Sequence, residues 1–164
     1  MIQRIQTVYL ALVAVLSILG LCLPLGQILD GATAVASFNN WMFSPELTSK
    51  AMASADFHDF APMALGILLL IVIALTFVSI LLFRFRMRQL RLTIFSTILL
   101  VGYVLYFAFL AWHYTGVASA VIDGASFHLC VAGIFPVLSV ILNCLAIHGI
   151  RKDEALVRSL DRLR

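Results

Sequence analysis

Residues 62–83, PMALGILLLIVIALTFVSILLF, form a stretch of 22 residues that contains no charged side chain. A helix of this length covers about 33 Å, which is enough to cross a hydrocarbon core of about 30 Å. Similar charge-free stretches occupy residues 5–25, 92–112 and 127–150. Because strands would leave backbone groups unpaired in lipid, each stretch predicts a transmembrane helix. We therefore predict an all-α membrane protein, with a four-transmembrane-helix bundle over residues 1–150.

The composition excludes a soluble globular domain. Of the 164 residues, 63% are hydrophobic and 12% are charged, whereas soluble domains average about 45–50% and about 25%. The first stretch also has features of a signal peptide, because Arg4 precedes it and an Ala34-x-Ala36 cleavage pattern follows it. However, the apolar stretch is longer than the core of a typical signal, and the pattern lies well beyond Leu25. We expect the first helix to be retained.

The distribution of basic residues predicts the orientation of the bundle. Only Lys50 lies in an outer loop, and the other ten of the 11 Lys and Arg residues lie before the first stretch, in the inner loop 84–91 or after residue 150. Cytoplasmic connections carry an excess of Lys and Arg, so both termini are predicted to be cytoplasmic. The predicted anchors at lipid headgroups are Arg4, Arg84, Arg86, Arg88, Arg91, Arg151 and Lys152. This arrangement indicates the lipid bilayer as a partner and argues against nucleic acid.

Two outer loops, residues 26–61 and 113–126, connect the predicted spans. In the first loop, TAVASF and WMF flank Asn39-Asn40, a pattern compatible with a short hairpin. A short helix over Pro45–Ala53 is a second interpretation of the same loop. The second loop is shorter, and Gly116 and Gly124 lie within it as helix breakers.

Asp, Glu, Lys and Arg are absent from the middle of all four predicted spans. Such groups usually mark proton relays and ion paths, so their absence argues against coupled transport by a monomer. The most polar residue within a span is Asn143, and Ser139 lies four residues earlier on the same side of the helix. An amide in lipid needs a hydrogen-bonding partner, so Asn143 and Ser139 are predicted to contact another helix.

The sequence contains no motif of established catalytic or redox chemistry. Its three cysteines, Cys22, Cys130 and Cys144, lack the spacing of metal ligands, although Cys22 and Cys130 could meet at one membrane face. The outer loops contain a weak metal-binding pattern of His and carboxylate side chains, namely Asp56, His58, Asp59, His113 and His128. Because such residues also serve as solvated loop groups, we expect no metal, cofactor or catalytic residue.

Residues 151–164, RKDEALVRSLDRLR, predict a short cytoplasmic amphipathic helix. Leu156, Leu160 and Leu163 share one stripe at helical spacing. Gly149 would permit a break between this helix and the fourth span. The stripe needs a surface to cover it. That surface is either the headgroups and the bundle's own inner face, or a protein partner.

Both ends of the chain and its inner loop contain specific motifs, MIQRIQTVYL at 1–10, RMRQLRL at 86–92 and KDEALVRSLDRLR at 152–164. Together they resemble a family of small four-span membrane proteins from Bacteroidota, catalogued as domain of unknown function 4293. The resemblance covers the whole chain in layout and implies a multi-pass protein of the bacterial inner membrane. It supplies no activity, ligand or catalytic residue. The four-span plan is also similar to that of claudin-like proteins, but only in architecture, because the large outer loop lacks a cysteine pair.

These features favour a non-enzymatic interaction, assembly or structural subunit that docks a partner through residues 1–4, the inner loop and the tail. An alternative is an oligomeric transport or channel subunit, with a polar path through Asn143, Ser139 and Thr97. A second alternative is an outer-face metal-dependent enzyme that uses the three outer histidines. The sequence leaves the oligomeric state open.

Overall fold

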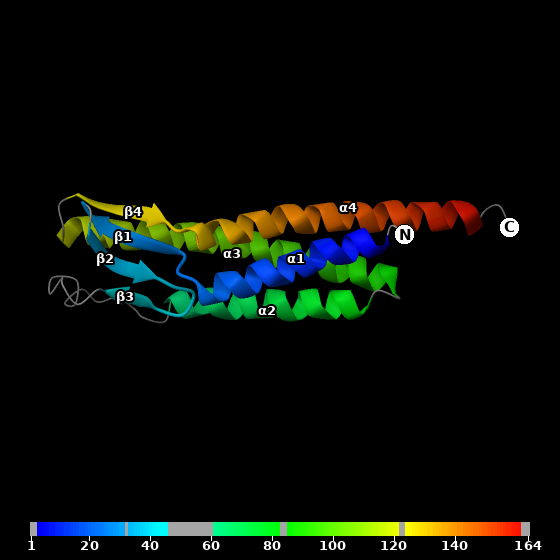
Figure 1. Ribbon diagram of the computed structural model, residues 1–164, viewed down its shortest axis with the longest axis horizontal. Coiled ribbons are helices and arrows are strands. Elements are labelled where there is room, and N and C mark those ends of the chain that lie inside the picture. Colours follow the sequence, from blue (N-terminus) through cyan, green and yellow to red (C-terminus); the bar gives the residue numbers. More distant parts are fainter. Residues whose placement is uncertain (1–2, 32, 46–60, 83–84, 122–123, 162–164) are drawn as a thin grey trace.

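The computed structural model describes residues 3–31, 33–45, 61–82, 85–121 and 124–161. In this part of the chain the helices are α1 (Gln3–Cys22), α2 (Ala61–Leu81), α3 (Arg86–Val121) and α4 (Phe135–Asp161), and the 3₁₀ turn η2 (Val131–Ile134) precedes α4. The strands are β1 (Gly26–Asp30), β2 (Thr33–Phe38), β3 (Phe43–Pro45) and β4 (Ala125–Leu129). Figure 1 shows the helices along the long axis and the strands at one end.

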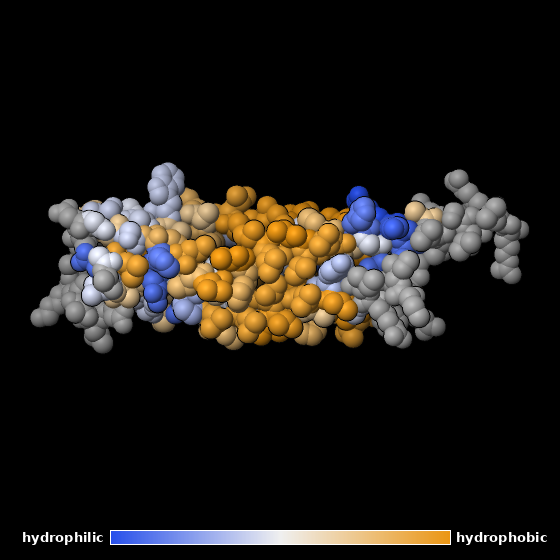
Figure 2. Space-filling view, turned by 45° about the horizontal axis from the view of Figure 1, so that its top comes forward, coloured by the Kyte–Doolittle hydropathy of each residue, from blue (hydrophilic) through white to orange (hydrophobic). Residues whose placement is uncertain are grey.

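The helices form a bundle in which α1 and α3 each pack against both α2 and α4. Within the described residues, α2, α3 and α4 are long and apolar enough to cross a membrane, whereas the apolar part of α1, Gln6–Cys22, is shorter. Large apolar side chains are exposed along the helices, and Figure 2 shows them as a band across the middle of the molecule. Soluble proteins rarely expose an apolar surface of this extent, so the band is typical of a membrane protein.

A four-stranded sheet covers one end of the bundle, so the all-α prediction was wrong for the outer loops. Its strand order is β3-β2-β1-β4, and all neighbours are antiparallel. β2 and β3 form the hairpin that the sequence allowed around Asn39-Asn40, with Phe38 opposite Phe43. β4 comes from the second outer loop and pairs with β1, with Gly26 opposite Leu129. The two loops stabilise each other because an isolated two-stranded hairpin is only marginally stable.

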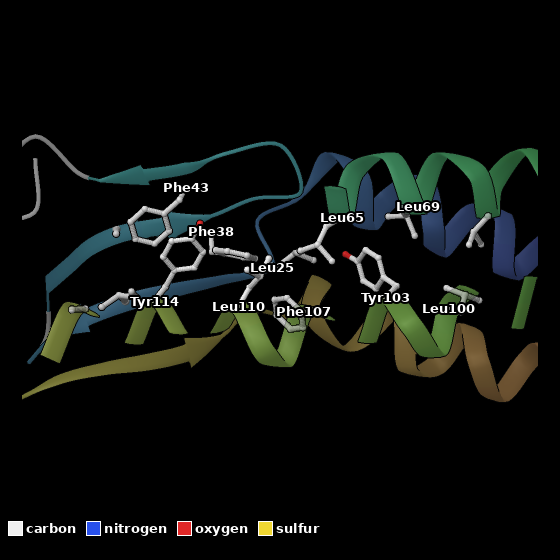
Figure 3. Packing of buried hydrophobic residues seen from close by; sticks show 14 of the residues in the cluster. Leu25, Phe38, Phe43, Leu65, Leu69, Leu100, Tyr103, Phe107, Leu110 and Tyr114 are labelled. Carbon is white, nitrogen blue, oxygen red and sulfur yellow. The ribbon is translucent and has the colours of Figure 1, made fainter. Parts of the chain in front are cut away.

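α3 continues to Val121, whereas the prediction placed residues 113–126 in a loop. The extension packs under the sheet, where the Tyr114 side chain is only 3% exposed. Its ring stacks on Phe43 with a centroid distance of 4.7 Å and an interplanar angle of 7°. Figure 3 shows these two rings gathered with Phe38 between α3 and the sheet. The sheet therefore covers helical turns that would otherwise be exposed.

The boundaries of the inner loop and of the fourth span also differ from the prediction. The inner loop was predicted at residues 84–91, but α3 already begins at Arg86. Residues 127–129 belong to β4 and not to a fourth span, because they pair with β1. The alternative prediction was a short helix over Pro45–Ala53. Pro45 is the last residue of β3, and the rest of that range lies outside the described residues.

α4 is continuous to Asp161 and extends past the ends of the other helices (Figure 1). The predicted break at Gly149 is therefore wrong. Gly149 instead allows α1 to approach closely, because a Cβ atom there would lie 3.0 Å from Cγ of Gln6. Of the predicted leucine stripe at 156, 160 and 163, the structure describes only the backbone of the first two residues.

Candidate functional site

Polar side chains gather inside the bundle, in the part that lies away from the sheet. Each is at most 7% exposed. We call this set the polar seam, and it consists of Gln6, Ser17, Thr76, Ser79, Gln89, Thr93, Ser96, Ser139, Asn143 and Asp153. Toward the sheet the interior becomes apolar, with buried residues such as Leu65, Leu69 and Phe107. The seam is thus confined to one part of the interior.

Some hydroxyl groups of the seam have partners. Thr76 Oγ1 donates to the Val72 carbonyl oxygen at 2.8 Å, and Thr93 Oγ1 donates to the Gln89 carbonyl oxygen at 2.9 Å. Ser79 Oγ lies 3.1 Å from Thr93 Oγ1. Because the Thr93 proton is already donated, Ser79 is the donor in this bond. The bond joins α2 to α3.

Other atoms of the seam have no hydrogen-bond partner among the described residues, namely Gln6 Nε2, Ser17 Oγ, Ser139 Oγ and Asn143 Oδ1. The amide nitrogen of Asn143 donates to Ser96 Oγ of α3, but over a long distance of 3.4 Å. A buried polar group without a partner costs about 1–3 kcal/mol. Native interiors contain only a few such groups per 100 residues. The four atoms found among the described residues agree with that frequency. Their position on two helices that pack together, α1 and α4, marks this region as the candidate site.

Ser17 and Ser139 lie at nearly the same height in the bundle. α1 and α4 are antiparallel, and their register is set where Gly149 meets Gln6. Counting 11 residues along α1 from Gln6 reaches Ser17, and counting 11 residues back along α4 from Gly149 reaches residue 138, next to Ser139. Two buried hydroxyls without partners among the described residues therefore share one level of the interior.

The seam ends on the sheet side at a junction built around Asn40, which lies in the turn between β2 and β3. Tyr103 Oη donates to Asn40 Oδ1 at 2.6 Å, and Asn40 Nδ2 donates to the Gly20 carbonyl oxygen at 2.6 Å. The Gly66 amide donates to the Asn40 carbonyl oxygen at 3.1 Å. We call these four residues the Asn40 junction. It connects the sheet to α1, α2 and α3.

Gly66 allows the turn to enter the bundle at this point. A Cβ atom on Gly66 would lie 2.9 Å from the Asn40 carbonyl oxygen and 3.0 Å from the ring of Trp41. A side chain at this position would therefore displace the turn. Figure 3 shows Tyr103 on α3 with its hydroxyl directed toward Leu65, that is, toward the sheet end.

Within the described residues, the predicted headgroup anchors lie at the end of the bundle away from the sheet. Those whose side chains are described, Arg88, Arg91, Arg151 and Lys152, are all exposed. The Arg88 guanidinium carbon lies 5.0 Å from the centre of the Phe85 ring. Arg84 lies outside the described residues, and only the backbone of Arg4 and Arg86 is described. This end of the molecule is therefore a basic surface.

The structure does not bring the candidate metal ligands together. His113 is exposed on α3, where its ring contacts Phe109 and Tyr114, and His128 is exposed on β4. Asp56, His58 and Asp59 lie outside the described residues. In the part of the chain that the structure describes, no three His, Cys, Asp or Glu side chains are grouped as a metal site requires. The thiols of Cys22, Cys130 and Cys144 are free.

The match to a known protein family covers nearly the whole chain. Residues 2–163 match the domain of unknown function DUF4293. The chain belongs to the DUF4293 family. The resemblance that the end motifs indicated is thereby confirmed for the family. A comparison with curated proteins found no match. The family description assigns no activity, so the roles of residues in this DUF4293 protein follow from its structure.

Sequence reasoning singled out Asn143 and Ser139 of this DUF4293 protein but missed the rest of the seam. The missed signal is spacing, because Gln89, Thr93 and Ser96 recur at intervals of four and three residues and so lie on one side of α3. No comparable pattern marks the Asn40 junction, whose members come from separate parts of the chain.

Proposed function

We propose that this DUF4293 protein is a non-enzymatic, multi-pass subunit of the bacterial inner membrane that docks a protein partner through its cytoplasmic end. In this proposal all four helices span the membrane, and both termini and the inner loop are cytoplasmic. Lipid covers the apolar band of Figure 2. The partner meets the basic end of the bundle and the projecting part of α4.

The charge distribution supports this orientation. Ten of the 11 Lys and Arg residues belong to the two termini and the inner loop, and such residues are retained on the cytoplasmic side. The short apolar part of α1 is compatible with a fourth span. Gln6–Cys22 contains 17 residues, and the lower limit for a transmembrane helix is about 17 residues.

The observation that carries the docking proposal is the unbroken course of α4 through Gly149. The backbone stays helical to Asp161 and extends beyond the ends of the other helices (Figure 1). A helix that continues in the direction of its span leaves the membrane, so it does not lie along the headgroups. The apolar stripe that the sequence predicts at Leu156 and Leu160 would therefore need a cover other than lipid. An apolar groove of a partner is the usual cover for such a stripe.

Photocrosslinking from single tail positions in native membranes tests this proposal. A photoreactive residue at Leu156 or Leu160 is expected to form a discrete adduct with a protein. The same residue at Glu154 or Arg158, on the opposite side of the helix, is expected to form little. Replacing both leucines with Ser should remove the partner, whereas Glu154→Ser with Arg158→Ser should retain it. Adducts with lipid alone at the leucine positions, or equal adducts on both sides of the helix, contradict the proposal.

The structure changes where a polar path for transport would have to run. A pore between copies would be lined by the outer surface of the bundle, but Asn143 and Ser139 are buried inside a single bundle. The Thr97 hydroxyl donates to the Thr93 carbonyl oxygen within its own helix. A polar path would therefore run along the seam of one chain and would have to open at the Asn40 junction. If liposomes with the Asn40→Ala variant stay tight to ions and small solutes, this second candidate is excluded.

A further inference from the structure

We propose that the polar seam is a binding site for a short chain of water molecules, open at the end of the bundle opposite the sheet and closed at the Asn40 junction. The seam contains four polar atoms without a partner among the described residues. Buried waters typically make about three hydrogen bonds each to groups that would otherwise be unsatisfied. The seam offers such groups on two helices that face each other, α1 and α4.

The chemistry of the unpartnered atoms selects a neutral ligand that both donates and accepts hydrogen bonds. Asn143 Oδ1 can only accept, Gln6 Nε2 can only donate, and the two serine hydroxyls can do either. A cation would require several oxygen ligands, and a charge without a partner is costly at this depth. The carboxylate of the seam, Asp153, is ten residues from Asn143 along α4, a distance of about 15 Å. Water fits this set, and an ion does not.

The two ends of the proposed chain differ. Toward the basic end of the bundle, buried polar residues continue through Thr93, Gln89 and Asp153. Toward the sheet, Leu100 and Leu69 are fully packed, and the Tyr103 hydroxyl is held by Asn40. The proposed chain therefore enters from the basic end, where the buried residues are polar.

Ser17 and Ser139 mark the inner limit of this chain. They lie at one level on neighbouring helices, and neither hydroxyl has a partner in the described part of the chain. Because each hydroxyl needs a partner and both lie at one level, the proposed chain places a single water between them. This shared water is the most specific element of the proposal.

Whether the Tm falls or rises in the Ser139→Ala variant tests for bound water in the polar seam. If water binds Ser139, Ser139→Ala removes a hydrogen bond, and the Tm of the full-length protein in detergent should fall. Ser79→Ala provides the scale, because it removes the bond to Thr93. Ser119→Ala, at an exposed hydroxyl on α3, is the neutral control. In a dry seam, Ser139→Ala removes an unsatisfied group, and the Tm should stay constant or rise. Either of those results overturns the proposal.

A water shared by Ser17 and Ser139 also predicts how the double variant should behave. Ser17→Ala combined with Ser139→Ala should lower the Tm by clearly less than the sum of the single changes, because one water is lost only once. Additive decreases contradict a shared water. A high-resolution density map of the unmodified protein decides the question even if a variant fails to fold. A peak about 3 Å from both hydroxyl oxygens supports the site, and an empty space between them overturns it.

Discussion

Tyr103 of α3 donates a hydrogen bond of 2.6 Å to Asn40, which lies 63 residues earlier in the chain. Both side chains are completely buried. The bond connects the turn of the β2–β3 hairpin to the interior of the bundle, and it lies where the apolar part of the interior meets the polar seam. The Asn40 junction therefore has two roles, since it holds the sheet on the helices and closes the seam.

Asn40→Ala is expected to destabilise the protein more than Tyr103→Phe. The alanine variant leaves both the Tyr103 hydroxyl and the Gly20 carbonyl oxygen without their partner, whereas the phenylalanine variant leaves only Asn40 Oδ1. At about 1–3 kcal/mol for each unsatisfied buried group, the expected losses are about 2–6 kcal/mol for Asn40→Ala and about 1–3 kcal/mol for Tyr103→Phe. Reversible unfolding in mixed detergent micelles measures both. A larger loss of unfolding free energy in Tyr103→Phe than in Asn40→Ala would contradict the two hydrogen bonds assigned to Asn40.

Gly66→Ala and Gly102→Ala form a matched pair in neighbouring helices. An alanine methyl at Gly66 would collide with the Asn40 carbonyl oxygen and Trp41, whereas nothing lies within 4 Å of the Cβ position at Gly102. We expect Gly66→Ala to lower the unfolding free energy by about 1–3 kcal/mol, as overpacking does. Gly102→Ala should be neutral or stabilising by up to about 1 kcal/mol, because alanine favours the helix. Equal effects of the two changes in a thermal melt would contradict the close approach of the turn.

Phe38→Ala should detach the sheet from α3. Phe38 is buried, and its ring contacts the rings of Phe43, Phe107 and Tyr114. Truncation of a buried phenylalanine costs about 3–5 kcal/mol. Met42→Ala, at an exposed position in the same hairpin, is the control and should change stability by less than about 0.5 kcal/mol. Hydrogen exchange of β1 and β2 amides measures the effect locally. Unchanged protection of these strands in Phe38→Ala would contradict the prediction.

The continuity of α4 predicts a defined distance across Gly149. Spin labels at Leu138→Cys and Ala155→Cys, in a background without native cysteines, are 17 residues apart and should be separated by about 26 Å in an unbroken helix. Both positions are exposed. Pulsed electron paramagnetic resonance in liposomes should show a narrow distribution at this distance. Gly149→Pro should broaden it. A shorter, broad distribution in the unmodified helix would mean that the tail bends onto the headgroups.

The helices at the centre of the molecule could be predicted from local sequence patterns. The charge-free stretch at residues 62–83 agrees with α2 to within two residues at either end. This prediction works because lipid leaves a backbone segment only its own hydrogen bonds, so a local apolar pattern is sufficient. The position of the basic residues at one end of the bundle follows from the same pattern. The helical state of the tail to Asp161 also follows from local spacing.

The packing at the ends of these helices depends on long-range contacts that no local pattern predicts. β1 and β4 pair although about 100 residues separate Ile28 from Phe127, and the sheet they form extends α3 to Val121. Gly149 is locally a helix breaker, yet it remains helical because α1 packs against it. Asn40 could not be matched to Tyr103 in advance. Local patterns report which side chains must be buried, but long-range packing decides which buried polar groups meet and which remain without a partner.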